Sequence, residues 1–386
     1  MAYFRNSAVN LLNIHYAIHS IAMTGAGAFF AAYLLKAGVS VPGIFLTFAA
    51  ILFGRFLIRP MIIGLAVRFG MRLLILAGTL ISALQYPLLA FVDGVGPALY
   101  ALIVIGSVAD TFYWPSYHAY FATVGDDEHR GHQVGAREAI AALVGIVSPL
   151  VTGFLLVSFG PRIAFGISAL IVAASAVPLL YTPEIKVSRE APGAFRAALP
   201  GVLLFVGDGF AGGIYVFVWQ VALFLSLGES FMAFGGALAV AAVVGAIGGL
   251  YLGRYIDSGG RNAVFVALGS ISVVLLVRAA ATHDPGLAFV ANALSALGGC
   301  LYVPTVMTVV YTLAKSAPCT LRFHVATEAG WDLGGATGLL VAAALVWLEV
   351  PLWAVILVGL VGLAWQFVLL RSHYAQRLAA ATAPAE

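Results

Sequence analysis

The chain has 386 residues and a formal net charge of +3, with 62% hydrophobic but only 9% charged residues. A soluble domain carries about 25% charged residues, so this composition excludes an ordinary soluble protein and predicts an all-α integral membrane protein. The small positive charge does not indicate a nucleic-acid partner, because most basic residues can be assigned to membrane topology.

Twelve apolar stretches are long enough to cross a bilayer, which takes about 20 residues in a helix. The longest polar stretch, TPEIKVSREAPGAFR, separates the sixth from the seventh. We therefore predict two six-helix bundles at 1–181 and 197–386, joined by a cytoplasmic linker at 182–196. The predicted spans are 8–35, 41–66, 72–92, 97–121, 134–158, 162–181, 197–226, 231–253, 263–282, 286–312, 324–347 and 350–371.

The positions of lysine and arginine predict the orientation of these spans. The first span is not followed by a small-residue cleavage site, so we interpret it as a membrane helix and not as a removed signal peptide. With the N-terminus inside, only Lys36, Arg162 and Arg278 fall on the outer side. Both termini are therefore expected to be cytoplasmic, in a bacterial inner membrane.

The two predicted halves resemble each other in sequence. A nearly constant shift along the chain places YWPS, at 113–116, on YVPT, at 302–305, and Glu138 on Glu328. The loop GLAVRFGMR, after the second span, falls on GRYIDSGGRN, after the eighth. Because these matches lie in corresponding helices and loops, we predict a duplicated six-helix unit, as many transporters have.

Twelve spans in two halves, a polar linker and this repeated Gly/Arg loop together resemble the major facilitator superfamily. The family's loop has the form G-x-L-A-D-R-x-G-R-R, and the resemblance implies that its aspartate helps to close the cytoplasmic gate. The second copy keeps that residue as Asp257, whereas the first has Val67. The gating residues expected from this loop and from the pair at the start of the fifth span are Arg68, Arg72, Arg137, Glu138, Asp257 and Arg261.

The fifth span contains GIVSPLVTGF, which is similar to the G-P-x-x-G-G pattern of exporters in this superfamily. Pro149 and Gly153 match it, while Ser148 and Thr152 replace glycines. The pattern favours efflux. The alternative is that these small residues only allow membrane helices to pack closely.

The resemblance implies that the first, fourth, seventh and tenth spans line a central cavity. Asp110 lies about halfway along the fourth span, where a carboxylate is costly and is therefore a candidate for proton coupling. The alternative is a structural pair with Arg55, which lies at a similar depth on the second span. Arg59 could extend toward the interface, whereas Arg55 needs an anion, either Asp110 or the substrate. Tyr113 and Tyr117 follow Asp110.

The first span carries Asn13, His15 and His19, with the two histidines one turn apart. Histidine titrates near neutral pH, so a proton relay or a substrate contact is reasonable. Two imidazoles without a third ligand make a poor metal site, and helix packing is the other alternative. The shift that places Tyr113 on Tyr302 also places His19 on Asp208, so the repeat predicts that these two face each other across the cavity.

Asp208 lies between two glycines, where a helix could be irregular. On the same span, Tyr215, Trp219 and Gln220 could form an aromatic and amide wall, although such aromatic residues more often pack or face lipid. Tyr302, in the repeated YVPT, is a further candidate.

The eleventh span begins FHVATEAGWDLGG and places His324, Glu328 and Asp332 at intervals of four, beside Trp331. Such a stripe cannot face lipid cheaply and should face the cavity or its cytoplasmic mouth. Because Glu328 repeats Glu138, the two could form salt bridges between the halves that close the inner gate. Direct proton coupling is the alternative.

These observations predict a secondary active transporter and not an enzyme, since the chain has no phosphate-binding Gly-rich loop with lysine. We expect alternating access, proton coupling and a small organic solute that is anionic or zwitterionic, with an efflux antiporter favoured. An uptake permease or a multidrug efflux pump remains open. A metal enzyme using His15 and His19, or a receptor, is a more distant alternative. No cofactor, metal or nucleic acid is expected, and the protein should act as a monomer with solute, protons and lipid as its partners.

Overall fold

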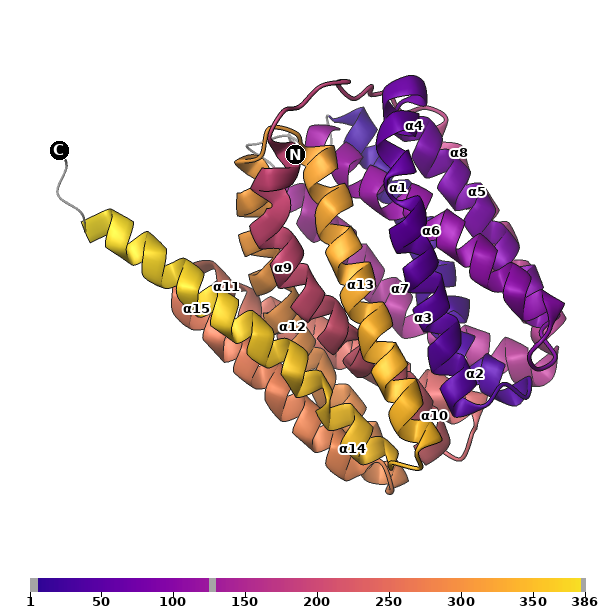
Figure 1. The fold of residues 1–386 in the computed structure, drawn as a ribbon. Helices are drawn as coiled ribbons and strands as arrows, with labels where there is room; N and C mark the ends of the chain where they lie inside the picture. The colour runs from indigo at the N-terminus through magenta and orange to yellow at the C-terminus, as the bar shows by residue number, and fades with distance from the viewer. Residues whose placement is uncertain (1–5, 125–129, 383–386) are drawn as a thin grey trace.

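The structure is a computed structural model that describes the backbone of residues 6–124 and 130–382. Within these ranges, the side chains of 130–141, 250, 252–261, 263, 308, 373 and 375–382 are outside the described part. Every regular element described is a helix (Figure 1). Those before the linker are α1 (Ser7–Ala22), η2 (Met23–Gly27), α2 (Phe30–Lys36), α3 (Val41–Ile58), α4 (Met61–Phe69), α5 (Met71–Ala90), α6 (Pro97–Val124), α7 (Arg130–Ser158) and α8 (Pro161–Leu179).

The helices after the linker follow the same order of crossings. They are α9 (Ala194–Gly212), η3 (Gly213–Val218), α10 (Trp219–Ser226), α11 (Phe231–Ala281), α12 (Pro285–Lys315), α13 (Thr320–Trp347), α14 (Leu352–Leu357) and α15 (Gly359–Thr382). In the described residues, 11 helical segments are long and apolar enough to span a membrane, and the shorter apolar helix Ala142–Ser158 adds the fifth crossing. The predicted all-α membrane fold of twelve crossings is confirmed.

Figure 1 shows the 182–193 stretch at one end of the molecule and α2, α10 and α14 at the other. This stretch, between α8 and α9, forms no helix, which agrees with a linker there, while the division of the chain into 1–181 and 197–386 remains a prediction. One difference concerns α11, whose helical backbone continues through 254–262, where two separate spans are predicted. At the corresponding place before the linker, Gly70, with a φ of 88°, separates α4 from α5.

The repeat is visible in the way the crossings begin. Ser40 accepts a hydrogen bond from the amide of Gly43 and starts α3, and its counterpart in the repeat, Ser230, caps α11 in the same way through Ala233. Such serine caps satisfy an amide that the first helical turn leaves free. The same shift relates the two π-helical segments, since it places the start of η2 at Met23 on the start of η3 at Gly213. Short π-helical turns are rare and are found mostly at functional sites.

The parts of the chain before and after the linker pack together mainly through α3 against α13 and α7 against α11. At the end of the molecule opposite the linker they are also joined by an ion pair of 2.7 Å between Lys36 and Glu229. Within the second half, α13 lies against α9 along much of its length (Figure 1).

The close packing of α13 and α9 depends on glycine. Glycines recur every fourth residue on the α13 face that meets α9, and a side chain there would collide with α9 carbonyl oxygens. A Cβ at Gly330 would lie 2.6 Å from the carbonyl oxygen of Val202, and one at Gly338 would lie 2.8 Å from that of Phe210. The stripe consists of Gly330, Gly334 and Gly338. Small residues of this kind let membrane helices approach backbone to backbone.

Candidate functional site

Arg59 lies at the end of α3 and is fully buried. Its Nη1 donates to Glu328 Oε2 at 2.7 Å, and its Nε donates to Asp332 Oδ2 at 2.8 Å. Nη2 also donates to Asp332. Arg59 therefore does not extend to the interface as expected, but is held inside the protein by two carboxylates of α13.

Arg55 lies one turn before Arg59 and shares one of its partners. Its Nη1 is 3.3 Å from Asp110 Oδ2 on α6, and its Nη2 is 2.9 Å from Asp332 Oδ1. The guanidinium also lies over the ring of Trp331, 5.9 Å from the centroid. The structure thus contains the Arg55–Asp110 pair that sequence depth suggests, and adds Asp332.

Together these five side chains form what we call the arginine network: Arg55, Arg59, Asp110, Glu328 and Asp332. It holds two guanidinium groups against three carboxylates, so it carries one excess negative charge when all are ionised. Asp332 is fully buried, whereas the side chain of Asp110 is 32% exposed. Because α3 and α6 precede the linker and α13 follows it, the network joins the two parts of the chain in the interior.

Asp208 on α9 lies beside the network and is held by neutral donors. Trp331 Nε1 donates to its Oδ2 at 3.0 Å and Gln366 Nε2 donates to its Oδ1 at 3.1 Å. The Tyr302 hydroxyl also reaches Asp208 Oδ1 and lies 2.7 Å from the side-chain oxygen of Gln366. Trp331 therefore connects Arg55 with Asp208. Sequence reasoning missed Gln366, an uncharged residue on the last crossing.

The histidines of α1 are packed within the first half. His15 Nδ1 lies 2.7 Å from the carbonyl oxygen of Ser175, and its Nε2 lies 2.9 Å from the Tyr113 hydroxyl. The ring of His19 stacks on that of Tyr113 at 4.6 Å. These contacts match the helix-packing alternative, and the described residues contain no group of three or more side chains suited to a metal. His19 is not placed opposite Asp208 by any described contact.

The remaining residues of the first and fourth crossings complete the same packing. Tyr117 stacks on Tyr113 at 5.5 Å, and Asn13 is 9% exposed. His324 of α13 is buried and lies 6.1 Å, between ring centroids, from His118 of α6. This contact joins the two halves one turn before Glu328.

The predicted aromatic wall on the seventh crossing belongs to a separate cluster. Trp219 is buried and its Nε1 donates to Asn292 at 3.0 Å, and its ring and that of Tyr215 face Arg278. Arg278, which the sequence predicts on the outer side, is only 6% exposed. The third member, Gln220, is partly buried.

The predicted cytoplasmic gate is described only in part. Arg68 lies over the ring of its neighbour Phe69. Arg72 contacts the linker, with its backbone amide donating to Glu184 at 2.9 Å and its Nη1 donating to the Thr182 carbonyl at 2.9 Å. Glu328 pairs with Arg59 in the described structure. The side chains of the other predicted gating residues lie outside the described part: Arg137, Glu138, Asp257 and Arg261.

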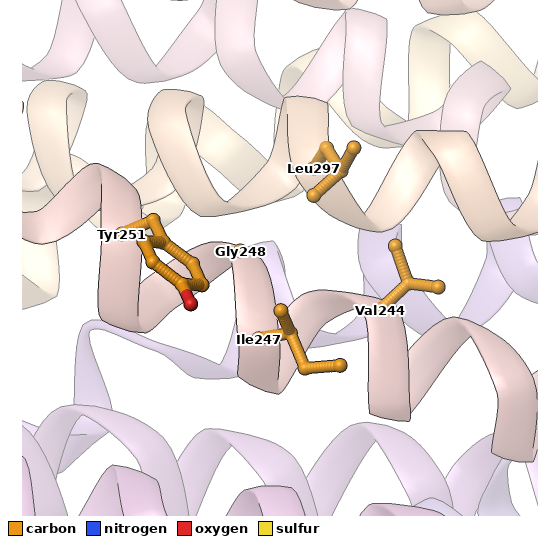
Figure 2. Close-up of a pocket in the computed structure, with 5 residues that line it drawn as sticks. All are labelled: Val244, Ile247, Gly248, Tyr251 and Leu297. Carbon is orange, nitrogen blue, oxygen red and sulfur yellow. The ribbon is translucent and has the colours of Figure 1, made fainter.

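An apolar hollow between α11 and α12 lies apart from these residues (Figure 2). Leu297 contributes from α12, and the other lining residues belong to α11: Val244, Ile247, Gly248 and Tyr251. The described residues that line it carry no charge, so they offer no partner for the polar part of a substrate.

Comparison with known proteins places this geometry in a family. The model of the Major Facilitator Superfamily matches residues 12–324. No curated protein sequence matches the chain. Among solved structures it is similar to the human organic anion transporter MFSD10 (TETRAN), with a TM-score of 0.71 and 16% identity, over 94% of this chain and 99% of that one.

Two further solved structures share the fold. The nucleoside transporter NupG has a TM-score of 0.69 and 14% identity, over 95% of this chain and 99% of its own. An auto-inhibited peptide transporter of the POT family has a TM-score of 0.72 and 12% identity, over 98% of each chain. The chain is therefore an integral membrane transporter and not an enzyme, with a small-molecule substrate and the lipid bilayer as its environment. It belongs to the major facilitator superfamily.

Proposed function

We propose that the protein is a proton-coupled secondary transporter of a small organic solute that carries a carboxylate. The observation that supports this most is the arginine network, which places three carboxylates on two arginines in the interior between α3, α6 and α13. An excess buried charge is costly. One of the three carboxylates is therefore the natural place for a transported proton.

Asp110 is the best candidate for that carboxylate. It is the most exposed of the three, and its contact with Arg55, at 3.3 Å, is the longest in the network. A proton on Asp110 removes its attraction for Arg55 and frees Nη1. A solute carboxylate can then occupy the same place, because guanidinium and carboxylate groups form strong paired hydrogen bonds.

This exchange predicts how proton and solute are linked. Because the solute replaces Asp110 on Arg55 only after Asp110 is protonated, the two bind together and travel in the same direction. The network also crosses between the halves, so opening the protein on this side must separate α3 from α13. Lys36 and Glu229 join the halves at the end opposite the linker. In alternating access, the contacts at one end would break as those at the other end form.

A second candidate is export of a cationic solute in exchange for a proton. The excess negative charge of the network favours it, since a cation and a proton would then compete for Asp110. The pattern around Pro149 and Gly153 in the fifth crossing is also similar to that of exporters. MFSD10 is described as an organic anion transporter, which agrees with the first candidate.

We also propose that both termini are cytoplasmic, that the protein lies in a bacterial inner membrane, and that it acts as a monomer. The orientation is supported by the basic residues near the linker end of the molecule, including Arg72, which binds the 182–193 stretch. Labelling cysteines introduced at the two termini with an impermeant reagent tests it, and access from outside the cell would contradict it.

The test of the function uses proteoliposomes with an imposed pH gradient and a panel of labelled mono- and dicarboxylic acids. We expect uptake into the compartment toward which protons flow. Asp110→Asn should lose the response to the gradient but keep exchange of internal for external solute, because a neutral amide at this position does not compete with the solute carboxylate for Nη1 of Arg55 and cannot take up a proton. Asp284→Asn is the matched control, since Asp284 lies outside the network and Asn also caps helices.

Three outcomes separate the candidates. Solute movement with the proton flow, lost in Asp110→Asn, supports cotransport of a carboxylate. Movement of cationic solutes against the proton flow supports the second candidate and contradicts the first. If Asp110→Asn responds to the gradient like the wild type, Asp110 is not the proton site.

A further inference from the structure

Arg278 is a buried cation whose surroundings are neutral. It lies in the last turn of α11 and is 6% exposed. Its Nε donates to Ser295 Oγ at 2.8 Å, and its Nη1 donates to the carbonyl oxygen of Tyr215 at 2.5 Å. Its guanidinium carbon lies over two rings, 4.7 Å from the centroid of Trp219 and 5.7 Å from that of Tyr215.

These contacts do not neutralise its charge. The described residues place no carboxylate within ion-pair distance of Arg278, in contrast to both arginines of the network. A guanidinium has five N–H groups, and the contacts above engage two of them, on Nε and Nη1. Aromatic faces attract a cation, but a buried charge normally keeps a counter-charge because removing it from water is expensive.

The fold itself does not require an arginine at this place. The shift that superimposes the start of η2 on the start of η3 puts Leu88 at the position of Arg278. The rest of the cluster is also replaced by residues without polar side chains: Gly25 for Tyr215 and Phe29 for Trp219 by the same shift, and, by the shift that places YWPS on YVPT, Ile103 for Asn292 and Gly106 for Ser295. The same six-helix unit therefore packs in the first half with no polar side chain at these five positions. The polar cluster serves something that only the second half does.

We propose that Arg278 is the binding site for a small monovalent anion, either a free halide such as chloride or the carboxylate of an organic anion. The site lies between Trp219 and Tyr215 of the η3–α10 region and Ser295 of α12. Such an anion supplies the missing counter-charge and accepts from the N–H groups that the described residues leave free. Its small size follows from the burial of the arginine.

The site is distinct from the arginine network and does not depend on the proposed function. Tyr215 follows Asp208 by seven residues, which is about 10 Å along a helix, and Arg278 shares no described contact with the network. An anion can bind here whether or not transport is coupled to protons. The two proposals can therefore fail separately.

The test measures the thermal unfolding of the purified protein at constant ionic strength, while sodium gluconate is replaced by sodium chloride, sodium bromide or sodium acetate. A ligand that binds only the folded protein raises Tm in a saturable way. We expect such a rise for the wild type. Arg278→Gln should bind the anion at least tenfold more weakly, as loss of a charged hydrogen-bond donor implies, and Arg278→Lys should retain part of the effect.

Bromide quenching of tryptophan fluorescence provides a second readout that does not depend on stability. Bromide quenches by contact, so the part of the quenching that comes from Trp219 should be absent in Trp219→Phe. In the wild type, chloride should reduce this part of the quenching. The matched control is Arg162→Gln, because Arg162 also lies over an aromatic ring, that of Phe91, at 5.7 Å, but is exposed. This variant should keep the full anion response.

The anions distinguish the two sources. Equal effects of chloride and acetate indicate a site for free small anions, whereas an effect of acetate alone indicates the carboxylate of an organic anion. If the Tm of the wild type does not depend on the anion and bromide reaches Trp219 no better than in Arg278→Gln, the proposal is wrong. An anion response that Arg278→Gln leaves unchanged contradicts it equally.

Discussion

Two regions of this transporter bury arginine in opposite ways. In the arginine network, Arg55 and Arg59 each contact two carboxylates, and the contacts with Glu328 and Asp332 cross between the halves. In the second half, Arg278 rests on a hydroxyl, a carbonyl and two aromatic rings. The first arrangement is complete within the chain, and the second lacks an anion among the described residues. A paired charge holds two parts of a protein together, while a cation without a carboxylate is available to a ligand.

Of the substitutions that test this comparison, the one at Arg59 is expected to have the largest effect on stability. Arg59→Met leaves Glu328 and Asp332 in the interior with one cation fewer, and removing one partner of a buried ion pair costs about 3–5 kcal/mol. We expect a large fall in Tm, measured by differential scanning fluorimetry. Combining it with Glu328→Gln should recover part of the loss. Arg278→Gln in gluconate should lower Tm much less, since it leaves no unpaired carboxylate behind. An equal fall in Tm in both variants would show that the two arginines are not stabilised in different ways.

A smaller effect is expected at Trp219, where a substitution tests how much the neutral surroundings stabilise Arg278. Trp219→Leu removes the ring that lies closest to Arg278 and the hydrogen bond to Asn292. A buried cation–π contact contributes up to about 2 kcal/mol, so Tm should fall moderately. Trp331→Leu provides the contrast, because Arg55 retains its carboxylates. If Trp331→Leu lowers Tm as much as Trp219→Leu does, the aromatic rings beside Arg278 do not take the place of a counter-charge.

The smallest effect is expected at the ion pair of Lys36 and Glu229, at the end of the molecule opposite the linker. Lys36 and Glu229 are each 42% exposed, and exposed pairs of this kind contribute about 0–1 kcal/mol, less as salt rises. Lys36→Gln should therefore change Tm very little while shifting the balance between outward-open and inward-open states. Cysteine crosslinking between the 36–40 and 226–230 loops measures that balance. An unchanged crosslinking rate would mean that the pair does not hold the outer side closed.

Much of the fold could be predicted from the sequence, because the apolar spans and the internal repeat are properties of the chain itself. The Arg55–Asp110 pair was also predictable, since a rise of about 1.5 Å per residue gives the depth of a residue on its helix. The depth of a residue does not tell in which direction around the helix axis its side chain points. Contacts such as that of Arg59 with Asp332, which are far apart in the sequence, follow from how α3 and α13 face each other.

The buried positions of Arg59 and Arg278 have one physical cause. Side chains on a helix tilt toward its N-terminus. Arg59 lies at the C-terminal end of the second crossing and Arg278 near the C-terminal end of the ninth, so each of these crossings begins on the far side of the membrane from its arginine. Both side chains therefore tilt back into the membrane and not toward the nearer interface. Gln366 was missed for a different reason, because a single neutral amide on an apolar helix gives no signal of its partners.

The glycine stripe of α13 decides where the molecule can bend. Gly330, Gly334 and Gly338 are set directly against the α9 backbone, so at these three positions the helices meet without an α13 side chain that could change its rotamer. Close-packed surfaces of this kind shift as units and do not deform gradually. Asp208 and Asp332 should thus keep a constant spacing through the cycle, because the two helices that carry them move as one rigid body. The moving surface then lies on the other side of α13, where α3 must separate from it.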